Sequence, residues 1–186
     1  NHFNDIKYSI DGVNSANLNK IYNGSNVRAI ATGDYHMLVL LENGTVFSSG
    51  RNNYGQLGIG STNDVSELTP VMSDLNSYYD SSGLSIDNYA DSIYAGGNSS
   101  AILLNSGRVL FFGDNQYGQL GYSLGGFKNI PYNITEEQFS ISNNGYDGTN
   151  CISLSLGDNF SSMIINSGKV INFGNNQSGQ LGIGVD

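Results

Sequence analysis

Few residues of this chain have side chains that could do chemistry, and they do not cluster in the sequence. His2, His36 and Cys151 are too few to bind a zinc ion through its usual four protein ligands. Neither a phosphate-binding loop ending in Gly-Lys-Ser/Thr nor a His-Glu-x-x-His motif occurs. The carboxylates of Glu136-Glu137 and of residues 87–91 lack the alternating oxygen ligands of a calcium loop. We therefore expect no enzyme, cofactor or metal, and we interpret His36 as a core or loop-bracing residue and Cys151 as a buried, inert thiol.

The charge balance excludes one broad class of function. Seven Lys and Arg against sixteen Asp and Glu give a formal net charge of -9, the wrong sign for a protein that grips a phosphate backbone. Charged residues make up 12% of the chain, which is unlike a protein of long helices. No apolar run approaches the roughly 18 residues of a membrane-spanning helix. We expect neither direct nucleic-acid binding nor membrane insertion.

One pattern occurs three times along the chain. A glycine is followed five residues later by Gly-Gln-Leu-Gly, and the copies begin 63 and 61 residues apart. The 186 residues therefore divide into units 1–60, 61–122 and 123–186 of a single repeat domain. The repeated motif residues are Gly50, Gly55, Gln56, Leu57 and Gly58, then Gly113, Gly118, Gln119, Leu120 and Gly121, and then Gly174, Gly179, Gln180, Leu181 and Gly182.

Each unit has the local pattern of β-strands. Two short apolar runs flank a turn with glycine at 37–49, 101–112 and 163–173, which predicts one β-hairpin per unit. Apolar residues at consecutive positions are typical of strands covered on both faces, and the runs are too short for buried helices. A further strand is expected before each hairpin, at 27–31, 92–95 and 151–156. The polar stretches 61–90 and 123–150 are expected to hold an outer strand and a surface loop.

The repeated Gly, Gln and Leu are interpreted as structural. Glycine accepts backbone angles and close approaches that other residues do not. An amide side chain both donates and accepts, so Gln56, Gln119 and Gln180 are expected to tie one loop to its neighbour, with the following leucine in the core. The alternative is that the three glutamines line a ligand site. The repetition disfavours it, because residues repeated in every unit usually hold the units together.

The pattern Gly-Asp-Tyr-His36, an apolar strand, Asn-Gly-Thr-Val and Asn-x-x-Gly-Gln-Leu-Gly resembles the repeat of the regulator of chromosome condensation family over nearly the whole chain. The resemblance implies an all-β fold in which each repeat gives a blade of about four strands in a β-propeller. Two frequent residues of the family are mostly replaced: the His by Ser99 and Phe160, and the Trp by Ser49, Phe112 and Phe173. Three blades leave two open edges, so we expect either part of a longer propeller or several copies that associate into a ring or filament.

Aromatic side chains outside the hairpins are the candidates for partner contact: Tyr78, Tyr79, Tyr89, Tyr122, Phe127 and Tyr132. Loop tyrosines give rigid contact area with a hydrogen-bonding tip, although packing on their own blades is the alternative. Asn133, in a sequon of the third unit, is the best candidate for glycosylation if the protein is secreted. The family resemblance instead implies the cytoplasm or nucleus, so the compartment stays open.

The leading hypothesis is a non-enzymatic protein-binding or scaffold module, whose partner is another protein or further blades or copies of the same chain. Some relatives in the family are guanine-nucleotide exchange factors for small GTPases of the Ran type, so the resemblance implies exchange or regulation of such a GTPase as an alternative. A third hypothesis, motivated by the open edges, is a secreted inhibitor or a self-assembling structural subunit.

Overall fold

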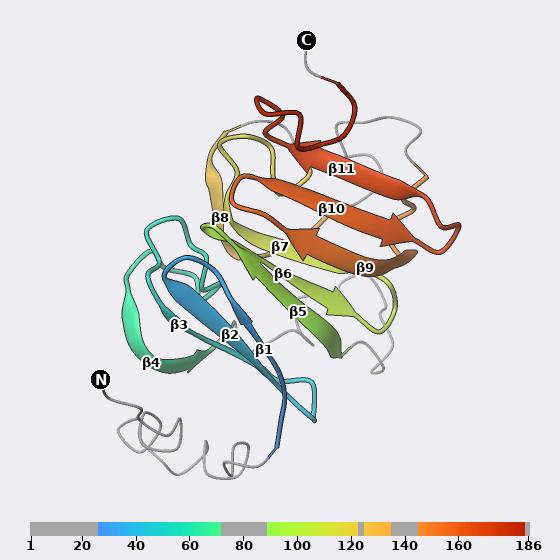
Figure 1. The fold of residues 1–186 in the computed structure, drawn as a ribbon. Coiled ribbons are helices and arrows are strands. Elements are labelled where there is room, and N and C mark those ends of the chain that lie inside the picture. The colour runs from blue at the N-terminus through green and yellow to red at the C-terminus, as the bar shows by residue number, and fades with distance from the viewer. Residues whose placement is uncertain (1–25, 72–88, 123–124, 135–144, 185–186) are drawn as a thin grey trace.

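The computed structural model of the protein describes residues 26–71, 89–122, 125–134 and 145–184, and the regular structure within them is entirely β (Figure 1). The strands form three antiparallel sheets, each following the order of the chain. The predicted all-β class and the predicted hairpins are confirmed. Within the described part, no helix is long and apolar enough to span a membrane.

Each sheet is one blade, and we number the blades 1 to 3 in chain order. Blade 1 contains β1 (Val27–Thr32), β2 (His36–Leu41), β3 (Val46–Gly50) and β4 (Val65–Pro70). Blade 2 contains β5 (Ala90–Gly96), β6 (Ser99–Leu104), β7 (Val109–Asp114) and β8 (Phe127–Asn133). Among the described residues, blade 3 contains β9 (Cys151–Leu156), β10 (Phe160–Ile165) and β11 (Val170–Gly174). The expected outer strands of the first two blades are therefore β4 and β8.

The blades and the predicted sequence units do not share boundaries. β4 pairs with β3 although it follows residue 60, and β8 pairs with β7 although it follows residue 122. The last strand of blade 1 thus lies in the predicted unit 61–122, and the last strand of blade 2 lies in the predicted unit 123–186. The division into 1–60, 61–122 and 123–186 remains an interpretation of the sequence repeat.

The hairpin between β2 and β3 shows why the turn sequence recurs. Gly44 adopts a φ of 83° and its N–H donates to the carbonyl oxygen of Leu41 at 3.0 Å. The side chain of Asn43 accepts from the N–H of Thr45 at 3.0 Å and closes the other side of the turn. A residue with a Cβ is strained at such a positive φ, which explains the glycine at the corresponding turns of blades 2 and 3.

Apolar side chains fill the spaces between neighbouring blades. Between blades 1 and 2 the core includes Leu38, Leu40, Ile102, Leu110 and Phe112. The core between blades 2 and 3 includes Ala101, Leu103, Phe111, Met163 and Phe173. Successive residues of β6 and β7 point alternately to the two cores, and every residue of both strands is buried. This two-sided burial is the reason for the consecutive apolar runs in the sequence.

The first strands of the three blades lie next to one another: β1 contacts β5, and β5 contacts β9 (Figure 1). Each of these strands carries a β-bulge at the same position, occupied by Arg28, Asp91 and Ile152. A bulge adds one unpaired residue and turns its side chain away from the regular alternation. The first strands of the three blades therefore place these three bulge residues at equivalent positions on adjacent strands.

Candidate functional site at the blade junctions

The repeated motif folds into a loop that satisfies its own backbone. In blade 1 the side-chain oxygen of Asn52 accepts from the N–H of Leu57 at 2.9 Å, and the side-chain oxygen of Gln56 accepts from the N–H of Tyr54 at 2.9 Å. The N–H of Gly55 donates to the carbonyl oxygen of Asn52 at 2.8 Å. We call this loop, residues 52–58, and its counterparts 115–121 and 176–182 the motif loops.

The other two motif loops make the same contacts. Leu120 donates to Asn115 at 2.9 Å and Leu181 donates to Asn176 at 3.0 Å, in each case from backbone N–H to side-chain oxygen. Gln119 and Gln180 also repeat the bond of Gln56, each accepting a backbone N–H at 2.9 Å. This asparagine begins the Asn-x-x-Gly-Gln-Leu-Gly pattern and lies two residues after the first glycine of all three copies, but it was not among the residues predicted to be structural.

At both junctions between blades the backbone carbonyl of the motif glutamine is an acceptor, whereas the glutamine amide crosses only the first junction. The hydroxyl of Ser100 in blade 2 donates to the carbonyl oxygen of Gln56 at 2.8 Å, and the hydroxyl of Ser161 in blade 3 donates to that of Gln119 at 2.8 Å. The Gln56 amide does reach across, to the side chain of Asn98 at 3.3 Å. The Gln119 amide instead donates to Asp114 within its own blade at 3.2 Å. A loop-to-neighbour tie is therefore present at both junctions.

His36 extends the first junction. The hydroxyl of Ser100 donates its proton to the carbonyl oxygen of Gln56, so the hydroxyl oxygen of Ser100 can only accept from Nε2 of His36, which lies 2.8 Å away. The neutral His36 ring is therefore the Nε2–H tautomer. Burial lowers the pKa of His36 to about 4, against the opposite influence of the Asp34 carboxylate. The neutral ring thus links β2 to blade 2 through Ser100, which agrees with the structural interpretation of His36.

The third motif loop is less covered than the first two. Gln56 and Gln119 are 0% and 1% exposed, whereas Gln180 is only half-buried. A Cβ on Gly58 would lie 2.9 Å from the ring of Phe112, but a Cβ on Gly182 would meet nothing within 4 Å. The difference arises because blades 2 and 3 cover the first two loops, and no described residue covers the third.

The predicted loop aromatics that the structure describes lie in more than one place on blade 2. The rings of Tyr122 and Tyr132 contact each other with their centroids 5.5 Å apart and their planes tilted by 58°, and the Lys128 ammonium lies 5.1 Å and 4.2 Å from their ring centroids. Burial, followed by the influence of Tyr132, raises the pKa of Tyr122 to about 12. Phe127 begins β8 and is exposed. Tyr78 and Tyr79 lie outside the described residues.

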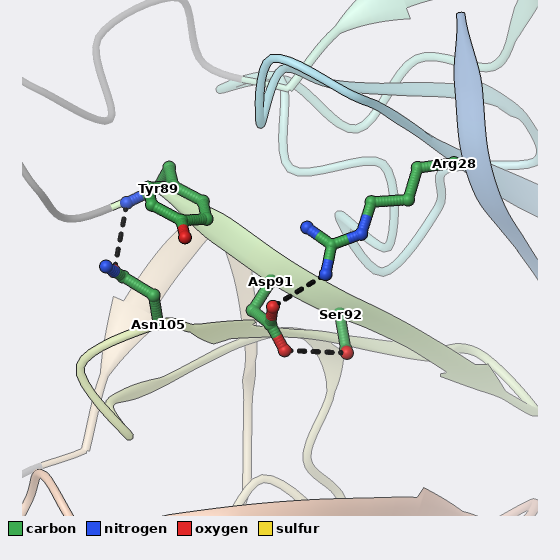
Figure 2. Close-up of polar contacts among 5 residues, drawn as sticks. All are labelled: Arg28, Tyr89, Asp91, Ser92 and Asn105. Atoms are coloured by element: carbon green, nitrogen blue, oxygen red, sulfur yellow. Dashed lines mark hydrogen bonds and ion pairs between the residues drawn. The ribbon is translucent and has the colours of Figure 1, made fainter.

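Tyr89 lies at the opposite end of blade 2, just before β5 (Figure 2). Its N–H donates to the side chain of Asn105 at 3.2 Å, and it contacts the turn of blade 1 at Gly44. Nearby, the bulge residues Arg28 and Asp91 form an ion pair at 2.7 Å between blades 1 and 2 (Figure 2). Since both side chains are about 40% exposed, we expect this pair to contribute no more than about 1 kcal/mol.

Two further predicted residues lie within strands. Asn133 is half-buried at the end of β8, paired with Leu110, and its glycosylation stays a prediction. Cys151 is buried at the start of β9, where burial raises the pKa of its thiol to about 11. The thiolate is therefore scarce at neutral pH.

One nucleophile-elbow pattern, Gly-x-Ser-x-Gly, occurs at residues 121–125. Such an elbow places its serine on a sharp turn between a strand and a helix. Here the described residues before the pattern belong to a motif loop, and those after it lead into β8. Ser123 itself lies outside the described residues. The surroundings are not those of an elbow.

The sequence and the fold are similar to known proteins. Residues 27–56 and 90–119 match one family model and residues 43–78 match another, both described as Regulator of chromosome condensation (RCC1) repeat. The Regulator of chromosome condensation of Drosophila melanogaster is 32% identical over 155 residues, which cover 82% of this chain and 24% of the relative. The human probable E3 ubiquitin-protein ligase HERC6 is 31% identical over 153 residues, which cover 82% of this chain and 13% of the relative.

A solved structure of Prp20p from Saccharomyces cerevisiae has a TM-score of 0.66 at 23% identity, covering 86% of this chain and 35% of that chain. The shared fold confirms that the three sheets are blades of the propeller type. The chain spans about a quarter or less of the length of the two curated relatives. Matching repeats, matching relatives and matching fold lead to one conclusion: the chain belongs to the family of proteins built from regulator of chromosome condensation repeats.

Proposed function

We propose that the three blades are a protein-binding part of a β-propeller, without catalytic chemistry of their own. The observation that carries the proposal is the use made of the repeated residues. Asn52, Gln56 and Leu57 close their loop and join it to blade 2, and their counterparts in blade 2 do the same toward blade 3. The repeat thus serves architecture, and the residues that differ between blades remain for recognition.

The relatives support a binding role. A regulator of chromosome condensation and a probable ubiquitin ligase share this stretch, yet it makes up 24% and 13% of their lengths. A part common to proteins of unlike activity is best explained by a task common to both, and recognition of another protein is such a task. The yeast structure was described together with the binding properties of Prp20p to Gsp1p and histones.

The test of this function is a selection on the full chain. A display library of natural protein fragments is selected on the immobilised protein, with the heat-denatured chain as counter-selection. We expect fragments that bind the folded chain and not the denatured one. A selection that returns only fragments bound equally by both forms contradicts a folded protein-binding surface.

Nucleotide exchange is the alternative, favoured by the binding of Prp20p to Gsp1p. The test measures release of fluorescent GDP from Gsp1p with and without the full chain, with EDTA-stimulated release as positive control. We expect no acceleration. Acceleration by substoichiometric chain would replace the scaffold proposal with exchange activity.

Self-assembly is a second candidate, favoured by the exposed face of blade 3. Ile164 and Val170 pair across β10 and β11 and are both exposed. One residue opposes head-to-tail closure: where blades 2 and 3 have Ser100 and Ser161, blade 1 has Met37, which cannot donate to the carbonyl of Gln180. Sedimentation equilibrium of the full chain over a wide concentration range tests this candidate, and a monomer throughout would exclude it.

A further inference from the structure

One exposed pair of side chains departs from the repeat in blade 1. Tyr35 lies in the turn between β1 and β2, and Arg51 follows directly after β3. The N–H of Arg51 donates to the carbonyl oxygen of Tyr35 at 2.8 Å, and its guanidinium carbon lies 5.6 Å from the centroid of the Tyr35 ring. The tyrosine is 68% exposed and Arg51 is also exposed. The two residues are thus held together at the surface.

Arg51 gives up a structural role that its counterparts keep. In blade 2 the side chain of Asp114 accepts from the N–H of Gln116 at 3.0 Å, and in blade 3 the side chain of Asn175 accepts from the N–H of Gln177 at 2.9 Å. These bonds close the start of each motif loop. An arginine has no acceptor, so blade 1 lacks this bond. This repeat position therefore exchanges an acceptor side chain that closes the loop for an exposed cation.

Tyr35 also departs from the residue that the other two blades have at its position. Blades 2 and 3 have Asn98 and Asn159 at this position. Asn98 accepts from Gln56 at the junction, and Asn159 donates to Asp158 at 3.0 Å. Tyr35 instead places a large ring in solvent. Both departures occur in one blade and touch each other.

The chemistry of the pair selects a ligand class. Nε of Arg51 donates to the side chain of Asn53 at 2.7 Å, which orients the guanidinium. No carboxylate of the described residues forms an ion pair with Arg51, although the chain carries sixteen Asp and Glu. Arg51 is exposed and its side-chain bond to Asn53 uses Nε, which leaves the terminal N–H groups, the fork that binds a carboxylate with two hydrogen bonds, without a hydrogen-bond acceptor among the described residues. Tyrosine and arginine are also the residues most enriched at the centres of protein interfaces.

We propose that Tyr35 and Arg51 bind an acidic segment of a protein partner, in which an Asp or Glu is flanked by an apolar or aromatic side chain. The carboxylate pairs with Arg51 and the apolar neighbour covers the Tyr35 ring. The pre-formed contact between the two residues lowers the ordering cost of binding. Because the chain has a net charge of -9, its long-range field repels an acidic segment, so recognition depends on short-range contact with Arg51 and Tyr35 where salt screens that repulsion. This proposal rests on the proposed protein-binding function.

The test uses residues that the chain itself carries in other blades. Arg51→Asn introduces the residue of blade 3 at that position, and Tyr35→Asn introduces the residue of blades 2 and 3. The matched control is Tyr117→Ser, which replaces an exposed tyrosine of blade 2 by the residue of blade 3. Thermal unfolding of each variant checks that the blades remain folded, and Arg51→Asn should unfold at the same temperature as the unchanged chain or higher.

A display library of random peptides is selected on the full chain, and enriched peptides are synthesised for affinity measurement. We expect enrichment of Asp and Glu, about tenfold weaker binding to each of the two variants, and unchanged binding to Tyr117→Ser. Replacing the peptide's acid by its amide should weaken binding to the unchanged chain but not to Arg51→Asn. Peptides without acidic preference, or with equal affinity for Arg51→Asn, overturn the site while leaving the protein-binding function intact. A failure of the fragment selection described above contradicts that function itself.

Discussion

The hydroxyl of Ser161 donates to the carbonyl oxygen of Gln119 over 2.8 Å and repeats, one blade later, the bond from Ser100 to Gln56. All four residues are buried. Because neither the hydroxyl nor the carbonyl can turn to water instead, this bond fixes how one blade sits on the next.

Replacing Ser161 by Ala tests that bond. We expect the free energy of unfolding to fall by about 1–2 kcal/mol, because the buried carbonyl of Gln119 loses its donor. Urea-induced unfolding followed by tyrosine fluorescence measures the change. Ser155→Ala, at an exposed position of β9, is the control and should change stability by less than about 0.5 kcal/mol. Equal effects of the two substitutions would argue against a stabilising bond.

His36 should make stability depend on pH. Its pKa in the folded chain is about 4, below the value of 6.5 for an unperturbed histidine, so the unfolded state binds the proton more readily. The stabilisation of the fold by the neutral ring is complete above pH 6.5, and it is lost progressively as the pH falls toward 4. The loss should level off at about 3 kcal/mol below pH 4.

The measurement compares urea unfolding of the unchanged chain and of His36→Gln between pH 4 and pH 7.5. The difference in stability between the two should change with pH in the window below 6.5 and stay constant above it. A difference that is constant across the whole range would mean that the folded and unfolded chains protonate His36 alike.

Gly58 and Gly182 form a matched pair for the packing of blades. Both have positive φ, 66° and 69°, so alanine costs each about 1–2 kcal/mol of backbone strain. At Gly58 the new Cβ would also lie 2.9 Å from Phe112 and 3.0 Å from Val71, whereas Gly182 has open space. We expect Gly58→Ala to destabilise by about 1–3 kcal/mol more than Gly182→Ala, measured by denaturant unfolding. Equal costs would mean that the first motif loop is not packed against blade 2.

Leu103 and Ile164 occupy the same position in β6 and β10, but Leu103 is buried between blades 2 and 3 while Ile164 is 37% exposed. Leu103→Ala should cost about 2–5 kcal/mol. Ile164→Ala should cost under about 1 kcal/mol in the monomeric chain. A larger cost for Ile164→Ala that grows with protein concentration would show that another copy covers this face.

The sequence alone was sufficient for the fold class. Short apolar runs around Asn43-Gly44 and its counterparts predicted the hairpins, because a positive φ and a strand length are local properties. The boundaries of the blades could not be predicted from the sequence in the same way. Strand β4 pairs with β3 across a register shift and belongs to blade 1, and nothing local to residues 65–70 says which unit they join.

The candidate site was predicted only in part. The repeated glutamines stood out, but the carbonyl of Gln56 and the hydroxyl of Ser100 are 44 positions apart, so their bond has no sequence signature. The loop aromatics were grouped by composition, and the structure separates Tyr89 from the contacting pair Tyr122 and Tyr132. The exposed pair of Tyr35 and Arg51 was missed because exposure is decided by what surrounds a side chain.

The sequence by itself determined the strands, the turns and the threefold repeat, since these follow from residue type and spacing. The tertiary structure decided which residues at the same repeat position have the same burial and the same contacts. Gln56 and Gln180 have the same neighbours in sequence, yet one is buried by the next blade and the other is half-buried. Contacts between blades join residues far apart in the chain, and their formation depends on packing that no local pattern encodes.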